Sequence, residues 1–507
     1  MNQVEQVTPA PTPPVTGRKP IWPRPAGPAQ PVALRAAVLA GVAAAVALPM
    51  DRPGIGWLLV GVALFGLTVM TAAGARHTGR AGRAGRAGRA GRAGRAERMV
   101  SLGWGVAAVV LLAVGTVRAA GWLFPCCVLG AMAAGSIAVA GGRSVRGLLL
   151  GAVAVPALAF GGLRWAGRGV ADARRQEGAS RLVGALLVSA ALLAVFAPLL
   201  AGADPEFARL LPTISVPTVL RWVLLFVLFG AGMIGAGYLC SGPRRPDPTD
   251  RAAAGQLRRL EWALPVGLLV ALFGVFVGVQ LTTLFGGDAL VRTTTGLTYA
   301  EYARTGFWQL LVVTLLTLMV IAVVARHASA ATPADRAWLR ILLGALSVLT
   351  LVIVASALSR MWAYQQAYGF TVLRLLVLSF ELWLGVVYLL ILAAGARRPA
   401  GWLPTAVAGT GLAALLGLAL VNPDRLIAEQ NIQRWQHSGK IDTAYLAGLS
   451  ADAVPALVRL PEPKRSCAIA VIADQLRADP DNWREWNLSR TTARALLADT
   501  PAPPANC

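Results

Sequence analysis

Long apolar runs recur along this chain, and short polar or basic connections separate them. A bilayer core is crossed by roughly 20 apolar residues in a helix, which matches the length of these runs. We therefore predict an all-α, polytopic helical membrane bundle of about eleven spans, at 32–50, 55–74, 100–117, 119–140, 182–200, 216–240, 262–286, 306–325, 337–358, 371–396 and 402–421.

A twelfth apolar stretch, 147–163, is short and interrupted by Pro156. If it does not cross, the segments on the N-terminal side of the membrane hold 29 Lys and Arg residues, against 8 on the other side. If it does cross, the count becomes roughly 20 against 17. Basic residues accumulate in short cytoplasmic loops. We therefore expect 147–163 to be re-entrant or interfacial, with the N-terminus inside and the C-terminus outside.

Two terminal regions differ from the apolar body. Residues 1–31 hold nine prolines and no apolar periodicity, which predicts a disordered tail. Residues 422–507 regain polar residues and helix punctuation, such as Ser450 before ADAVPALVRL and Ser489 before TTARALLAD. We expect a small extracytoplasmic helical domain there, after N-terminal membrane helices in 32–181 and core membrane helices in 182–421.

Composition supports lipid as the solvent. The chain has 507 residues, of which 56% are hydrophobic and 14% charged, and its net charge is +23. The positive charge lies mostly between spans, so it predicts membrane topology and no nucleic-acid partner. One basic segment, the loop at 76–98, carries Arg at every third position from Arg80 to Arg98. It is either a low-complexity expansion or a polybasic segment that binds anionic lipid.

Metal and cofactor chemistry finds no support in the sequence. Three histidines are scattered, and the five cysteines form no metal-binding pattern, so no metal or cofactor is expected. Cys467 and Cys507 are either a disulfide pair, which an extracytoplasmic domain permits, or two free thiols. Nucleotide-binding, zinc-protease and serine-hydrolase motifs are absent, so a non-enzymatic role is favoured and an enzymatic one stays open.

Tyrosine and arginine gather in two of the expected outer loops. Four of the seven tyrosines lie there, whereas the outer loop at 201–215 has no Tyr or Trp. Interfacial aromatic anchoring is the simpler interpretation, and a ligand-binding surface is the alternative. The candidate binding residues in these loops are Arg292, Tyr299, Glu301, Tyr302, Arg304, Arg360, Tyr364, Tyr368 and Arg374.

Glu381 is the one acidic residue well inside an expected span. It lies about 15 Å deep at 1.5 Å per residue, so it is a functional candidate unless it is a buried structural pair. Its expected partners are Arg374, on the same helical face, and Gln280. Beyond the last span, Asn431 and Arg434 would emerge on the same outer surface as the two loops, and Asp424 is expected to cap the next helix.

Three stretches carry a resemblance to a known family. They read YAEYARTGFWQLL, RMWAYQQAYGFTVLRL, and NPDRLIAEQNIQR followed by DTAYLAGLSADAVPAL. The chain resembles the domain-of-unknown-function 4173 family of uncharacterised bacterial multi-pass proteins over roughly 180–500. The resemblance implies a bacterial cell-membrane location and supplies no activity.

Three functions are compatible with these features. The first is a protein that binds a ligand, envelope component or partner at its outer face. The second is an ion- or proton-coupled secondary transporter that uses Glu381. The third is an enzyme acting on a lipid-linked substrate, which lacks an activated nucleophile or metal set. The first is the interpretation that we favour.

Overall fold

The fold is taken from a computed structural model that describes residues 22–80, 90–175, 216–243, 257–295, 299–329, 331–397 and 400–498, with isolated positions between 189 and 204. Over these residues the chain is helical, and its one extended pairing is an isolated bridge between Leu257 and Ala328. The expected all-α class is therefore confirmed for the described part of the chain.

Long apolar helices make up the body of the protein. Among the described residues, nine helices are long and apolar enough to cross a membrane, and α1 is a shorter apolar helix. The expected span at 182–200 lies outside the described residues, so the count of eleven stays a prediction. The helices of the body are α1 (Pro31–Ala47), α2 (Ile55–Arg80), α3 (Ala90–Val117), α4 (Leu123–Ala140), α10 (Val216–Ser241), α11 (Arg259–Thr295), α12 (Tyr299–His327), α13 (Pro333–Tyr368), α14 (Val372–Ala396) and α15 (Leu403–Val421).

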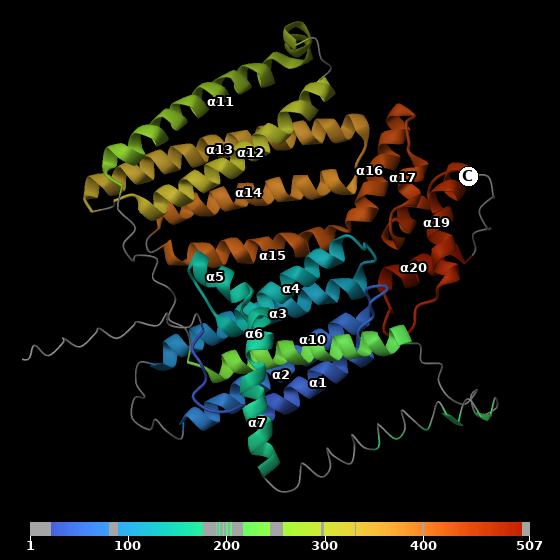
Figure 1. Ribbon diagram of the computed structural model, residues 1–507. Coiled ribbons are helices and arrows are strands. Elements are labelled where there is room, and N and C mark those ends of the chain that lie inside the picture. Colours follow the sequence, from blue (N-terminus) through green and yellow to red (C-terminus); the bar gives the residue numbers. More distant parts are fainter. Residues whose placement is uncertain are drawn as a thin grey trace, which may run out of the picture.

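The body helices lie side by side in two groups, with α15 between them (Figure 1). One group contains α1 to α4 and α10, and the other contains α11 to α14. Small residues bring α1 and α10 close together, because a Cβ on Gly41 would lie 2.6 Å from the ring of Phe226. Close approach through Gly and Ala is how helices associate in lipid, where burial of apolar surface no longer drives packing.

The segment 147–163 does not form one continuous helix. It falls within three short helices, α5 (Val145–Ala152), α6 (Ala154–Gly161) and α7 (Leu163–Arg175), which run across the direction of the long helices (Figure 1). Helices of eight residues, such as α5 and α6, cover about 12 Å and are too short to span a bilayer. This geometry agrees with the expectation that the stretch does not cross.

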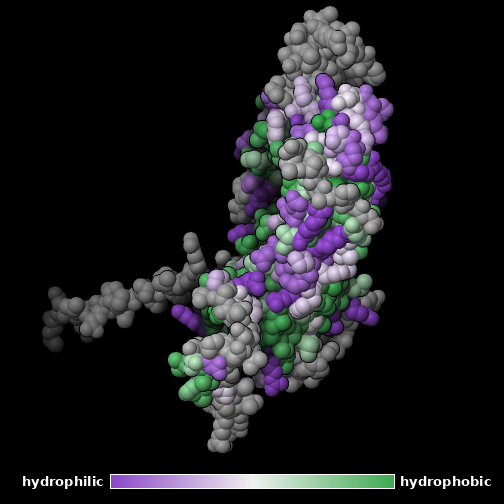
Figure 2. All heavy atoms as spheres, turned by 90° about the vertical axis from the view of Figure 1, so that its right-hand side faces the viewer, coloured by the Kyte–Doolittle hydropathy of each residue, from purple (hydrophilic) through white to green (hydrophobic). Residues whose placement is uncertain are grey.

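The residues after α15 form a compact helical domain at one end of the bundle (Figure 1). Its core includes Leu446, Leu457 and Ile469, and it is continuous with Leu111 and Leu123 from the ends of α3 and α4. Seen from that end, hydrophilic residues gather over the domain (Figure 2). Its helices are α16 (Pro423–Ser438), α17 (Thr443–Ala447), α18 (Val454–Leu457), α19 (Lys464–Ala478) and α20 (Leu488–Leu497), with a 3-10 turn at Ala451–Ala453. A second 3-10 turn, Ala400–Trp402, lies outside this domain and precedes α15.

Polar side chains fasten this domain to the loops between spans. The Asp452 carboxylate accepts hydrogen bonds from the backbone amides of Ala119 and Ala120 at 2.7 and 2.9 Å. The Asn487 amide donates to the carbonyls of Gly115 and Arg118, both at 2.8 Å. Burial raises the pKa of the Asp452 carboxyl above its ordinary value. The domain is thus held by buried polar contacts as well as by apolar packing.

Two helix starts differ from the expected ones. The side chain of Asn422, not Asp424, caps α16, because its oxygen accepts from the Arg425 amide. Asp424 is instead bonded to the Trp122 indole at 2.9 Å and to the Ser450 amide at 3.0 Å. The last helix begins at Leu488 with Asn487 as its cap, not after Ser489. The Asp424 carboxylate, which local spacing predicted to be a helix cap, therefore makes long-range hydrogen bonds instead.

Candidate functional site

The two Tyr/Arg segments are mostly helical rather than loops. α11 continues to Thr295, α12 begins at Tyr299, and α13 continues to Tyr368. The segment SRMWAYQQAY holds good helix formers and no Gly or Pro, so the helix ends only at Gly369, whose φ of +86° favours glycine. The side chains of five candidates lie outside the described residues: Arg292, Tyr299, Glu301, Tyr302 and Arg304.

The other candidates of these two segments form a cluster where α13 ends. The guanidinium of Arg374 lies over the Tyr364 ring, 4.3 Å from its centroid, and donates to the Tyr364 hydroxyl at 3.2 Å. It also donates to the carbonyls of Tyr368, at 3.2 Å, and Gly369. The rings of Tyr364 and Tyr368 are 5.0 Å apart. Arg374 therefore satisfies carbonyls that the end of α13 leaves without helical partners.

Arg360 lies deeper, on the part of α13 that faces α11 and α12. It is 7% exposed and donates to the side-chain oxygen of Gln280 at 2.9 Å. A Cβ on Gly306 would lie 2.2 Å from its guanidinium, so glycine makes room for this side chain. Arg360 thereby links α13 to α11 through the Gln280 side chain.

Asn431 and Arg434 join α16 to the end of α13. The buried amide of Asn431 donates to the Phe370 carbonyl at 2.8 Å and accepts from the Phe370 backbone amide at 3.1 Å. Arg434 donates to the carbonyls of Gln366 and Ala367 at 3.0 and 2.6 Å. The structure thus brings both residues next to Tyr364, Tyr368 and Arg374, as expected, and engages them in holding two elements together.

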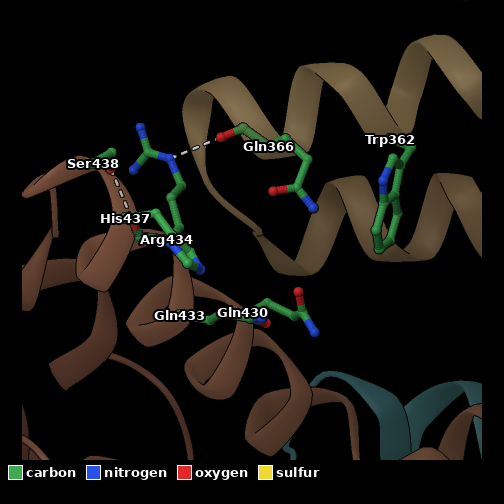
Figure 3. A pocket seen from close by; sticks show the side chains of 7 residues that line it. All are labelled: Trp362, Gln366, Gln430, Gln433, Arg434, His437 and Ser438. Carbon is green, nitrogen blue, oxygen red and sulfur yellow. Dashed lines mark hydrogen bonds between the residues drawn. The ribbon is translucent and has the colours of Figure 1, made fainter.

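A pocket of about 480 Å³ opens beside this junction (Figure 3). Trp362 and Gln366 reach it from α13, and Gln430 and Gln433 reach it from α16 across the gap. Volumes of this order are usual for small-molecule sites. The lining is completed by Arg434, His437 and Ser438.

The pocket offers polar groups that the fold does not use. Within the described residues, the side-chain amides of Gln366, Gln430 and Gln433 make no hydrogen bond. The Trp362 indole is 49% exposed and contacts the Phe370 ring edge-on at 5.7 Å. Each glutamine amide can donate and accept, and an indole offers a flat amphipathic face.

Sequence reasoning missed most of this lining and named only Arg434. The missed signal was positional. Trp362 and Gln366 are four residues apart, and Gln430, Gln433 and His437 follow spacings of three and four. Residues with those spacings share one face of a helix. The polar faces of α13 and α16 form the pocket only together, so neither segment predicts it from its own sequence.

Glu381 lies at the centre of a second polar cluster, inside the second helix group. Its side chain is fully buried, and Thr314 of α12 donates to one carboxylate oxygen at 3.4 Å. The other oxygen has no hydrogen-bond partner among the described atoms. Tyr388 lies seven residues after Glu381, on the same face of α14, and its hydroxyl donates to the Thr314 carbonyl at 2.6 Å. The expected partners are engaged elsewhere, since Gln280 binds Arg360 and Arg374 binds the end of α13.

Neither site resembles a metal centre. Among the described residues, no group of three or more His, Cys, Asp or Glu side chains could hold a metal ion. Cys126, Cys127 and Cys240 form no disulfide, whereas Cys467 is disulfide-bonded. Cys507, the fifth cysteine, lies outside the described residues.

The nine helices of span length and apolar composition in the described part of the chain indicate an integral membrane protein of the multi-pass helical class. The chain belongs to the family described as domain of unknown function DUF4153, whose profile matches residues 106–460. The expected family number, 4173, was wrong, and the match begins further toward the N-terminus than the resemblance did. No curated protein and no solved structure matches the chain.

Proposed function

We propose that this protein binds a polar component of the bacterial cell envelope in the outer-face pocket between α13 and α16. The observation that supports this is the set of three unengaged glutamine amides facing an exposed indole across a cavity of about 480 Å³. Arg434 fixes the two helices to each other through backbone carbonyls, so the pocket is pre-formed. A pre-formed site avoids the cost of ordering its lining when the ligand arrives.

The lining chemistry fits a sugar unit better than a lipid tail or a phosphate. Amides satisfy hydroxyl groups as donors and as acceptors, and the indole face covers the apolar face of a pyranose ring. Arg434 is the one permanently charged side chain of the lining, and it already donates three hydrogen bonds to carbonyls. The proposed ligand is therefore a neutral, hydroxyl-rich part of an envelope glycan.

An outer location for the pocket rests on two observations. The count of Lys and Arg, 29 against 8, favours a cytoplasmic N-terminus in the cell membrane. The disulfide at Cys467 is typical of an oxidising compartment, which agrees with an extracytoplasmic C-terminal domain.

Calorimetric titration of the full chain in lipid nanodiscs tests the binding proposal. Nanodiscs are preferred because glycosidic detergents would compete for the site. The probes are N,N′-diacetylchitobiose and maltose. We expect measurable binding of at least one probe, and we expect Trp362→Ala and Gln430→Ala each to weaken it roughly tenfold, about 1.4 kcal/mol.

The matched control is Trp483→Ala. Trp483 is an exposed tryptophan of the C-terminal domain and does not line the pocket. It should bind as the wild type does. Absence of binding by the wild type, or unchanged affinity in Trp362→Ala, would contradict the proposal.

Proton- or ion-coupled transport is a second candidate, favoured by the buried carboxylate oxygen of Glu381 that has no described partner. An ionisable group at this depth is costly and is common along ion pathways. The test is solute-driven proton movement in proteoliposomes with a pH-sensitive dye. Glu381→Gln should abolish it, and Glu429→Gln, which alters an exposed ion pair with Arg425, should not. Coupling that persists in Glu381→Gln rules this residue out.

A further inference from the structure

Helices α6 and α7 carry a surface that the rest of the described protein leaves uncovered. Their inner face is buried, with Ala159, Trp165 and Ala166 each less than 8% exposed. Their outer face presents Phe160 at 72% and Leu163 at 47% exposure. Beside these apolar side chains, Arg164 and Arg168 are exposed. We call these four residues, Phe160, Leu163, Arg164 and Arg168, the α7 patch.

Helix α7 runs across the direction of the long helices and packs against the segment that leads into α1 (Figure 1). The Trp165 indole donates to the carbonyl of Gly27 at 3.0 Å, and Gly27 precedes the first residue of α1. A Cβ on Gly169 would lie 2.4 Å from the carbonyl of Ala29, so α7 is in direct contact with that entry. A helix that crosses the direction of the spans where an apolar helix begins is typical of the boundary between lipid tails and headgroups.

The guanidinium groups of the patch are not engaged by other described residues. Arg164 and Arg168 form no hydrogen bond or ion pair with the described residues. They are four positions apart, which places them on one side of α7 with their Cβ atoms about 6 Å from each other. The one acidic residue of the helix is Asp172, on the turn after Arg168. Apolar groups beside paired guanidinium groups are typical of an interfacial amphipathic helix.

We propose that the α7 patch binds an anionic phospholipid. Arg164 and Arg168 take the headgroup phosphate, since guanidinium groups match phosphate oxygens with two hydrogen bonds. Phe160 and Leu163 lie against the upper part of the acyl chains. The site is distinct from the arginine-rich loop at 76–98, for which anionic lipid was expected from sequence. It also goes beyond the outer-face pocket, because that pocket lies where α13 meets α16, whereas α7 lies on the other helix group, beside α1 (Figure 1).

Native mass spectrometry of the full chain in detergent tests the proposal. The probes are phosphatidylglycerol and phosphatidylethanolamine with identical acyl chains. We expect preferential retention of phosphatidylglycerol. A basic residue near an anionic surface contributes about fivefold, so Arg164→Gln with Arg168→Gln should weaken retention roughly 30-fold. Added salt should weaken wild-type retention, as electrostatic contacts require.

Two control variants locate the effect. Arg258→Gln with Arg340→Gln removes two exposed arginines elsewhere and should retain phosphatidylglycerol as the wild type does. Glutamine at Arg83, Arg86 and Arg89 tests the arginine-rich loop and should leave the retention largely intact. Equal retention of the two lipids, an unchanged Arg164/Arg168 double variant, or loss confined to the loop variant would each overturn the proposal.

Discussion

Replacing Asn431 by alanine should release the end of α13 from α16. The Asn431 side chain makes two hydrogen bonds to the backbone of Phe370, at 2.8 and 3.1 Å, and one to the Ile427 carbonyl at 2.9 Å. Phe370 is 3% exposed, so its amide and carbonyl would lose their partners in a place that water reaches poorly. Two of these bonds join α16 to the end of α13, so a net loss of about 1 kcal/mol per bond predicts a loss of about 2 kcal/mol of local stability at the junction.

Hydrogen–deuterium exchange of the peptide covering 366–374 measures this directly. A local loss of about 2 kcal/mol corresponds to roughly 30-fold faster exchange of the Phe370 amide. Alanine is a better helix former than asparagine, so α16 itself should stay helical and the effect should be confined to the junction.

The matched control is Gln436→Ala, which removes an exposed amide from the same helix and should leave exchange at 366–374 unchanged. Slow exchange in Asn431→Ala, or an equal acceleration in Gln436→Ala, would refute the reasoning that this side chain holds the junction.

Three further predictions concern the C-terminal domain and its attachment. Because burial raises the pKa of Asp452 above 3.8, the docked domain binds a proton more tightly than the undocked one. Docking should therefore be strongest at acidic pH and weaken as pH rises through the ordinary carboxyl value to the raised one, and Asp452→Asn should flatten this dependence in proteolysis assays. Gly369→Ala places a Cβ 2.7 Å from the Asn431 side-chain oxygen at a φ of +86°, so the unfolding temperature in scanning fluorimetry should fall, for a cost of about 1–3 kcal/mol. Maleimide should label Cys467 only after reduction, and labelling of the untreated protein would contradict the disulfide.

The membrane helices were accessible from sequence because lipid imposes a simple rule. Every backbone polar group must be satisfied inside the segment, so an apolar run of span length becomes a helix with few alternatives. The short length of 147–163, its Pro156 and the count of Lys and Arg predicted that this stretch does not cross, and its three short helices agree with that prediction. Hydropathy placed the end of α13 near residue 358, however, because it does not measure helix propensity, and the polar turns up to Tyr368 were taken for a loop.

The candidate site was predictable only in part. Asn431, Arg434, Tyr364 and Arg374 do lie together, as a shared outer surface required. Their bonds to backbone carbonyls depend on how α16 meets the end of α13, which no local pattern records. The pocket lining was missed for the same reason, since its glutamines become neighbours of Trp362 only after the two helices meet.

The side of the membrane on which the C-terminal domain lies is the claim most open to direct measurement. Cysteines introduced at Gln433, in the pocket lining, and at Arg258, at the opposite end of the bundle, can be labelled in intact cells after replacement of Cys126, Cys127 and Cys240. We predict that a membrane-impermeant maleimide labels position 433 directly and position 258 only after permeabilisation. The reverse order would contradict the orientation and remove the proposed envelope ligand from reach of the pocket.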